Sequence, residues 1–64
     1  MTELLTLQEA AKELRISIHT LRVWVYQKRI PVVRLGRRIF IRRKDLEEFI
    51  AKNVVKAKED WIRF

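Results

Sequence analysis

The stretch Ser17–Ile41, SIHTLRVWVYQKRIPVVRLGRRIFI, decides the fold. Ser17 favours the N-cap of a helix, and Pro31 ends the helical part because the residue before a proline is disfavoured in helical geometry. Between these two positions, apolar and polar side chains separate at helical spacing. The core-facing side consists of Ile18, Leu21, Trp24 and Val25, and the outward side of His19, Arg22, Val23, Tyr26 and Gln27. The stretch therefore predicts a helix that packs on a core and presents polar and basic groups outward.

A β-hairpin is predicted directly after this helix. The runs 32–35 and 39–42 are rich in β-branched residues, and three residues, 36–38, join them as a loop. Gly36 can adopt a positive φ in that loop. A two-stranded hairpin is unstable alone, so it must pack on the helices. The side chains expected to do so are some of Val33, Leu35, Ile39 and Ile41.

Two further helices are predicted, one on each side of this stretch. The first follows a capping box, TLQE at residues 6–9, in which the side chains of the first and last residues accept each other's backbone N–H. The other runs from Arg43 or Lys44 to Lys52 and carries acidic residues in its first turns, where the helix dipole favours them. Their apolar stripes are Leu7, Ala10, Ala11 and Leu14 in the first helix and Leu46, Phe49 and Ile50 in the other.

The fold class predicted by these patterns is mainly α with a small β-hairpin. The order of helix, helix, two-stranded wing and helix is that of a winged helix-turn-helix domain, here over residues 1–52. Residues 53–64 form a C-terminal tail or a helix extension. Val54 and Trp61 are seven residues apart, which fits an extension that offers a seam to a second subunit or another partner. The same segment equally fits a frayed end with Trp61 folded onto the domain.

Positive charge is concentrated in one segment of the chain. The 64 residues carry a net charge of +7, and ten positive side chains lie from Arg15 to Lys44 with no acidic residue among them. The rest of the chain has five positive and eight negative side chains. A basic face of this kind indicates a polyanionic partner, with nucleic acid expected first.

Several other functional classes have no support in the sequence. The chain has no cysteine and one histidine, which provides neither a disulfide nor a metal site. No glycine-rich phosphate loop and no set of nucleophile and base indicates an enzyme, so no cofactor or small-molecule substrate is expected. The apolar runs are far shorter than the roughly 20 residues that cross a bilayer, and no secretion signal is recognisable. We expect a cytoplasmic, nucleoid-associated protein.

The sequence resembles the small excisionase-like DNA-binding proteins of the MerR-like winged-helix group over roughly residues 4–52. The matching motifs are LTLQEAA at 5–11, SIHTLRVW at 17–24, IP at 30–31, RLGRR at 34–38 and RRKDL at 42–46. The resemblance implies that the second helix enters the major groove of duplex DNA and that the wing lies along the minor groove or its phosphates. It also implies a bacterial or phage recombination directionality factor that binds repeated sites cooperatively and bends DNA. Its implied protein partner is an integrase or a second copy, contacted through residues 53–64.

The sequence departs from this family at the end of the second helix, where a glycine is usual and Lys28 stands instead. Lys28 is therefore expected either to contact phosphate or to adopt a left-handed conformation, at a cost of about 1 kcal/mol.

Thirteen residues are candidates for DNA contact. Arg22 has the donor geometry to pair with guanine or to clamp a phosphate, and Arg37 and Arg38 suit a narrow A·T-rich minor groove. Arg34, Arg42 and Arg43 are expected on phosphates, which position a protein without reading sequence. The full set is Ser17, His19, Thr20, Arg22, Val23, Tyr26, Gln27, Lys28, Arg34, Arg37, Arg38, Arg42 and Arg43.

Three other functions stay open at this point. A small transcriptional regulator of the same fold shares all the features above. An RNA-binding basic domain is disfavoured, because the A-form major groove is too narrow for a helix and only Phe40 offers an aromatic ring on a strand. A protein-interaction module would use Trp61, Ile62 and Phe64. A membrane-surface helix is the weakest alternative, since it leaves the wing and both helix caps unexplained.

Overall fold

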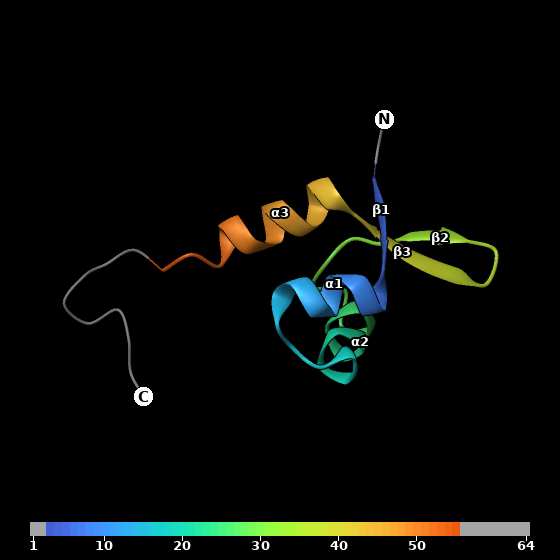
Figure 1. The fold of residues 1–64 in the computed structure, drawn as a ribbon, viewed down its shortest axis with the longest axis horizontal. Coiled ribbons are helices and arrows are strands. Elements are labelled where there is room, and N and C mark those ends of the chain that lie inside the picture. The colour runs from blue at the N-terminus through green and yellow to red at the C-terminus, as the bar shows by residue number, and fades with distance from the viewer. Residues whose placement is uncertain (1–2, 56–64) are drawn as a thin grey trace.

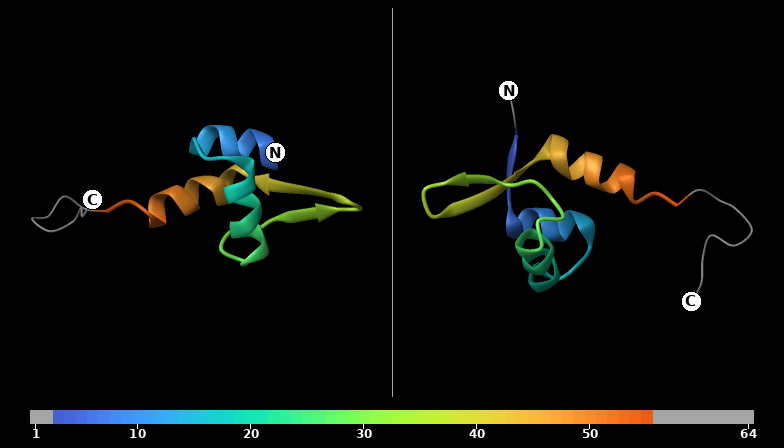
Figure 2. Two further views of the ribbon diagram at one scale, coloured as in Figure 1. Left: turned by 90° about the horizontal axis from the view of Figure 1, so that it is seen from below. Right: turned by 180° about the vertical axis from the view of Figure 1, so that it is seen from behind.

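The computed structural model describes residues 3–55 of the chain (Figure 1). Three helices pack at the base of a small sheet, and the hairpin and the last helix extend in opposite directions from the centre of the molecule (Figures 1 and 2). The elements are β1 (Leu4–Thr6), α1 (Leu7–Leu14), α2 (Ile18–Tyr26), β2 (Val33–Leu35), β3 (Arg38–Arg42) and α3 (Arg43–Lys52). The predicted winged helix-turn-helix is confirmed. The predictions for the tail beyond residue 55 lie outside the described residues.

The capping box at the start of α1 forms as predicted. The Thr6 N–H donates to Glu9 Oε1 at 2.9 Å, and the Glu9 N–H donates to Thr6 Oγ1 at 3.1 Å. The helix ends at Arg15, which is left-handed with φ 59°. The Ile16 N–H then donates to the Ala11 carbonyl at 3.1 Å, as in a Schellman motif. This sharp exit turns the chain toward α2 within three residues.

The start of α2 also follows its sequence signal. Ser17 Oγ accepts the Thr20 N–H at 3.0 Å, and Leu21 is fully buried. After Tyr26 the chain again closes a Schellman motif: Lys28 is left-handed with φ 61°, and the Arg29 N–H donates to the Trp24 carbonyl at 2.9 Å. The left-handed conformation expected for Lys28 is therefore present.

Replacing Lys28 with glycine should stabilise the fold. A side chain in left-handed geometry costs roughly 1–2 kcal/mol, and glycine removes this strain. Glycine also raises the conformational entropy of the unfolded chain, which offsets part of the gain in stability. The expected gain is about 0.5–1 kcal/mol in the free energy of unfolding, which denaturant titration would measure. Gln27→Gly is the matched control, because Gln27 has φ −80° and gains nothing from glycine. An equal response of the two variants would contradict the expected strain.

The sheet contains a strand that the sequence did not indicate. β1 pairs with β3, which also pairs with β2, so that the antiparallel order is β1-β3-β2. The prediction of a two-stranded sheet was therefore incomplete. β1 has three residues, the last of which is the N-cap of α1, so the strand has no alternation long enough to recognise.

The hairpin loop is one residue shorter than predicted. Leu35 pairs with Arg38, which leaves two loop residues, and Gly36 takes the expected positive φ of 62°. A shift of one residue in register turns every side chain of a strand to the other face. Val33 therefore lies opposite Phe40 rather than Ile41, and Leu35 is 52% exposed. Ile41 is the member of the four candidates Val33, Leu35, Ile39 and Ile41 that joins the buried core.

The core collects one or two side chains from almost every element. Its buried members are Leu5, Ala10, Ala11, Leu21, Ile30, Ile41 and Leu46. The Trp24 and Phe49 rings pack at 5.4 Å between centroids and join α2 to α3, which confirms the packing role predicted for Trp24. In α3, Leu46 is buried and Phe49 half-buried, but Ile50 is 45% exposed, so the predicted stripe is wrong at its last residue.

Candidate nucleic-acid interface

The outward face of α2 is free of the core along its whole length. The exposed side chains on this helix and its two caps are Ser17, His19, Arg22, Val23, Tyr26 and Gln27. Tyr26 is 88% exposed and Val23 42% exposed, so both side chains are accessible to a partner. Thr20 is half-buried, and its hydroxyl lies 3.0 Å from Ser17 Oγ at the helix start.

A groove of about 840 Å³ lies between α2 and the hairpin. It is lined by Thr6, Leu7, Gln8, Ile18, Arg22, Val25, Tyr26, Lys28, Val32, Arg34, Arg37, Arg38 and Ile39. The arginine of the helix and the arginines of the wing therefore border the same open surface. One ligand can therefore contact the helix and the wing at the same time.

The charge along this groove has one sign. Five of its lining side chains are positive, namely Arg22, Lys28, Arg34, Arg37 and Arg38, and none of the acidic residues within 3–55 lines it. Low-dielectric walls bearing one sign of charge focus the electrostatic potential and attract a polyanion over several ångströms. Half of the ten positive side chains between Arg15 and Lys44 thus lie on one surface.

The two wing arginines are held differently. Arg37 lies in the loop at the tip of the hairpin, beside Gly36. The Arg38 guanidinium carbon lies 5.3 Å from the centroid of the Phe40 ring, a cation–π contact along β3. Arg38 is therefore partly oriented by the sheet, while Arg37 extends the basic surface outward.

The N-terminal end of α1 contributes residues that sequence reasoning missed. Thr6, Leu7 and Gln8 line the groove, and the Gln8 amide is exposed there. These residues reach the wing because β1 pairs with β3, with Thr6 opposite Phe40. No local sequence pattern predicts this contact, because it depends on strand pairing between residues more than thirty positions apart.

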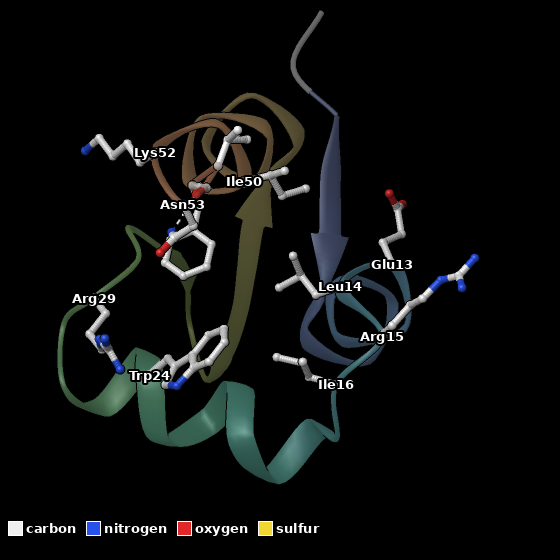
Figure 3. Close-up of a pocket in the computed structure, with 11 residues that line it drawn as sticks. Glu13, Leu14, Arg15, Ile16, Trp24, Arg29, Ile50, Lys52 and Asn53 are labelled. Carbon is white, nitrogen blue, oxygen red and sulfur yellow. Dashed lines mark hydrogen bonds between the residues drawn. The ribbon is translucent and has the colours of Figure 1, made fainter. Parts of the chain in front are cut away.

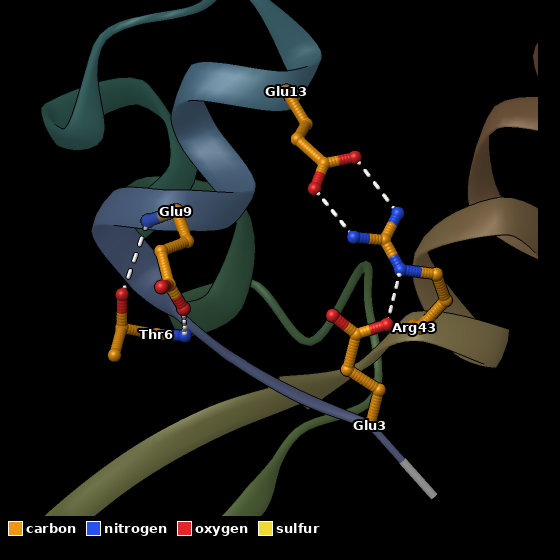
Figure 4. A network of polar contacts seen from close by, with 5 residues as sticks. All are labelled: Glu3, Thr6, Glu9, Glu13 and Arg43. Carbon is orange, nitrogen blue, oxygen red and sulfur yellow. Dashed lines mark hydrogen bonds and ion pairs between the residues drawn. The ribbon is translucent and has the colours of Figure 1, made fainter.

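Two arginines of the candidate set are engaged by carboxylates instead (Figure 4 shows the second). Arg42 pairs with Asp45 through Nε at 2.5 Å and Nη2 at 2.9 Å. Arg43 donates to both carboxylate oxygens of Glu13, at 2.8 and 2.6 Å, and to Glu3 at 2.9 Å. Neither arginine lines the groove. Arg42 makes a local ion pair at the start of α3, whereas Arg43 connects α3 to α1 through Glu13 and to the chain before β1 through Glu3.

These ion pairs lower the pKa of the Glu13 and Asp45 carboxyl groups. The hydrogen bond from Arg43 lowers the pKa of Glu13 below its ordinary value of 4.5, more than partial desolvation raises it. The hydrogen bond from Arg42 likewise lowers the pKa of Asp45 below 3.8. A carboxyl whose pKa is lower in the folded than in the unfolded chain contributes stability above the unfolded value, and this contribution is lost as the pH falls through the folded value.

Acidification should therefore lower the melting temperature through Glu13. The expected loss develops below pH 4.5, and Glu13→Gln should flatten this part of the profile because the variant has no carboxylate to protonate. Circular dichroism melts over a pH series would measure it. Glu47→Gln, an exposed change on α3, is the control and should keep the wild-type profile. An unchanged acid slope in Glu13→Gln would show that the contact with Arg43 does not contribute.

Within residues 3–55, no group of three metal-ligating side chains comes together, and none of the helices is long and apolar enough to cross a membrane.

The comparisons with known proteins agree with this geometry. The sequence matches the family model described as "Helix-turn-helix domain" over residues 4–54, which is most of the chain. A search of curated proteins and a search of solved structures found no match. The matched segment contains both capped helices, the wing and α3. The chain therefore belongs to the helix-turn-helix domain family, whose excisionase-like members bind DNA sequence-specifically.

Proposed function

We propose that α2 lies in the major groove of duplex DNA while the β2–β3 hairpin reaches the adjacent minor groove. The observation that carries this proposal is the single basic groove shared by Arg22 on the helix and Arg37 at the wing tip. An α-helix fits the width of the B-form major groove, and its exposed side chains then meet base edges. Arginine is favoured in a narrow minor groove, where the negative potential is strongest.

Within this arrangement, the exposed side chains of α2 divide into two groups. Arg22 pairs with guanine O6 and N7, and the apolar Val23 contacts a thymine methyl group. His19, Tyr26 and Gln27 flank these positions as further base or phosphate contacts. Ser17 and Thr20 lie at the helix N-terminus, which favours an anion.

The remaining basic side chains position the domain on the phosphates. Lys28 and Arg34 lie along the wall of the groove between helix and wing, where the DNA backbone would cross. Arg42 and Arg43 drop out of the proposed contacts, because their N–H donors already serve carboxylates. The proposed interface thus consists of α2, the turn after it and the hairpin.

For the biological role, we propose an excisionase-type recombination directionality factor. This part rests on the resemblance and on the size of the domain. One short recognition helix and one wing contact few base pairs, so useful specificity requires several copies on neighbouring sites. An integrase is the protein partner that such a role implies.

Random-site selection followed by salt titration tests the DNA proposal. The groove has five basic side chains, so binding should neutralise at most about five phosphates, and the slope of log K against log salt should be no steeper than about −4.5. Selection should return a short motif, and gel-shift stoichiometry should reveal the number of copies per site. Structured RNA binding at least as tightly as the selected duplex at the same salt would overturn the proposal.

The recombination role has a separate test. A duplex carrying several selected motifs in tandem should bend on binding. The bend would be detected as a gel mobility that depends on the position of the motifs within the DNA fragment. Binding without bending, and without tighter binding to tandem motifs than to one, would leave DNA recognition in place but contradict the excisionase-type role.

A further inference from the structure

A second groove, separate from the basic one, lies where α1, α2 and α3 meet (Figure 3). Its volume is about 720 Å³, and it shares no residue with the groove beside the wing. The apolar part of its wall is formed by Leu14, Ile16, Trp24, Phe49 and Ile50. Figure 3 shows Leu14, Ile16, Trp24 and Ile50 pointing into the space between the helices.

The margin of this groove is polar and mainly positive. Arg15, Arg29 and Lys52 lie there with one acidic residue, Glu13, whose carboxylate is already neutralised by Arg43. The Arg29 guanidinium stacks 5.7 Å from the centroid of the Trp24 ring. An apolar floor with a basic margin suits a segment that combines large apolar side chains with carboxylates.

The chain itself contains such a segment close by. Val54, at the end of the described part, lines the groove and is 66% exposed. The sequence then continues as KAKEDWIRF, in which the acidic pair Glu59-Asp60 directly precedes Trp61-Ile62. The acidic pair complements the basic margin of the groove, and the two apolar side chains after it complement the apolar floor.

We propose that this groove binds the chain's own segment Glu59–Phe64, with Trp61 on the apolar floor and the acidic pair at the basic margin. Trp61 is six positions after Val55, and an extended chain covers roughly 3.3 Å per position, or about 20 Å. A segment tethered this closely to its site has an effective concentration on the order of millimolar. Occupancy by the same molecule is thereby favoured over a second copy at ordinary protein concentrations.

The proposed contact has consequences for the two surfaces of the molecule. It would cover apolar area on Ile50, which the fold leaves 45% exposed. It would leave the basic groove open, because the two grooves have no residue in common. Of the two sequence expectations for residues 53–64, the proposal follows the one in which Trp61 folds onto the domain rather than contact with an integrase or a second copy. It does not depend on the DNA-binding proposal.

A spin label on the full-length chain tests this proposal. The protein has no cysteine, so Arg63→Cys creates a single site for a nitroxide. In the ¹⁵N spectrum, the amide signals of Leu14 and Ile16 should lose intensity, and Trp61→Ala should restore them. No loss of intensity, or a loss that survives Trp61→Ala, would overturn the proposal.

A mixed sample separates the same molecule from a neighbour. Spin-labelled protein without ¹⁵N is combined with ¹⁵N protein without the label, and the signals of Leu14 and Ile16 should then keep their intensity. Loss in the mixed sample equal to that in the single sample would identify a second copy as the occupant and overturn the proposal.

A substitution in the groove provides an independent arm. Ile50→Asp places a charge on the apolar wall and should abolish the intensity loss at Leu14 and Ile16. Val23→Asp is the matched control, since Val23 is 42% exposed on the other face of α2 and does not line this groove. Persistent loss of intensity in a folded Ile50→Asp protein would contradict the proposal. Should that variant unfold, the Trp61→Ala comparison decides alone.

Discussion

Replacing Arg22 with alanine is expected to weaken binding to the selected DNA site by about 1–3 kcal/mol, a loss of roughly 5- to 150-fold in affinity. The side chain is exposed in the middle of α2 and lines the basic groove, where a guanidinium can make two parallel hydrogen bonds to guanine. Removal of such a pair also removes the penalty against wrong bases at that position. The substitution should therefore relax specificity at one base pair while lowering affinity for the site.

Competition gel shifts with the selected duplex and its single-base variants would measure both effects. Arg29→Ala is the matched control, because Arg29 is also an exposed arginine near the end of α2 but lines the other groove. An equal loss of affinity for all duplex sequences would indicate that Arg22 contacts a phosphate rather than a base. Equal losses for Arg22→Ala and Arg29→Ala would contradict the placement of α2 in the major groove.

The sequence predicts well those features that depend on a few neighbouring residues. Both helix starts follow from side chains that bond backbone N–H groups three residues ahead, Thr6 to Glu9 and Ser17 to Thr20. The two faces of α2 follow from helical spacing alone, since Leu21 is buried and Arg22 exposed. These interactions are local, so their geometry is fixed before any tertiary contact forms.

The errors arise where distant parts of the chain meet. Pairing of Leu35 with Arg38 makes the loop one residue shorter than the composition suggested, and that single step turns Val33 and Leu35 away from the predicted face. In the observed register, Ile41 belongs to a core whose other members come from distant parts of the chain, and no local pattern encodes that placement.

Arg43 illustrates the same limit for the candidate site. In the sequence it belongs to a run of basic residues, RRK at 42–44, that resembles a phosphate-binding patch. In the fold its partners are Glu3 and Glu13, which are 40 and 30 positions away. Composition locates the basic surface around Arg22 and the wing, but the division between arginines that line the groove and arginines in ion pairs requires the tertiary structure.

Leu21→Ala should have the largest effect on stability. Leu21 is fully buried on α2 and belongs to the single core cluster. Truncation of a buried leucine costs about 2–5 kcal/mol through lost transfer energy and the cavity left behind. A domain of this size has a total stability of roughly 3–10 kcal/mol, so the variant is expected to be partly unfolded at room temperature. Urea denaturation followed by far-ultraviolet circular dichroism would measure the loss.

Val23→Ala is the control for this loss, because it removes apolar atoms two residues away on the exposed face of the same helix. Its expected effect on the free energy of unfolding is within about 0.5 kcal/mol. Equal destabilisation by the two substitutions would contradict the assignment of the α2 faces.

DNA links the Leu21 prediction to the proposed function. A ligand that binds only the folded state stabilises it by mass action, so saturating amounts of the selected duplex should restore helical content to Leu21→Ala. The apparent affinity of the variant should fall in proportion to its unfolded fraction, with the sequence preference unchanged. Arg22→Ala should show the converse, an intact fold with altered preference. Leu21→Ala protein that stays unfolded at saturating duplex would contradict recognition of DNA by the folded helix.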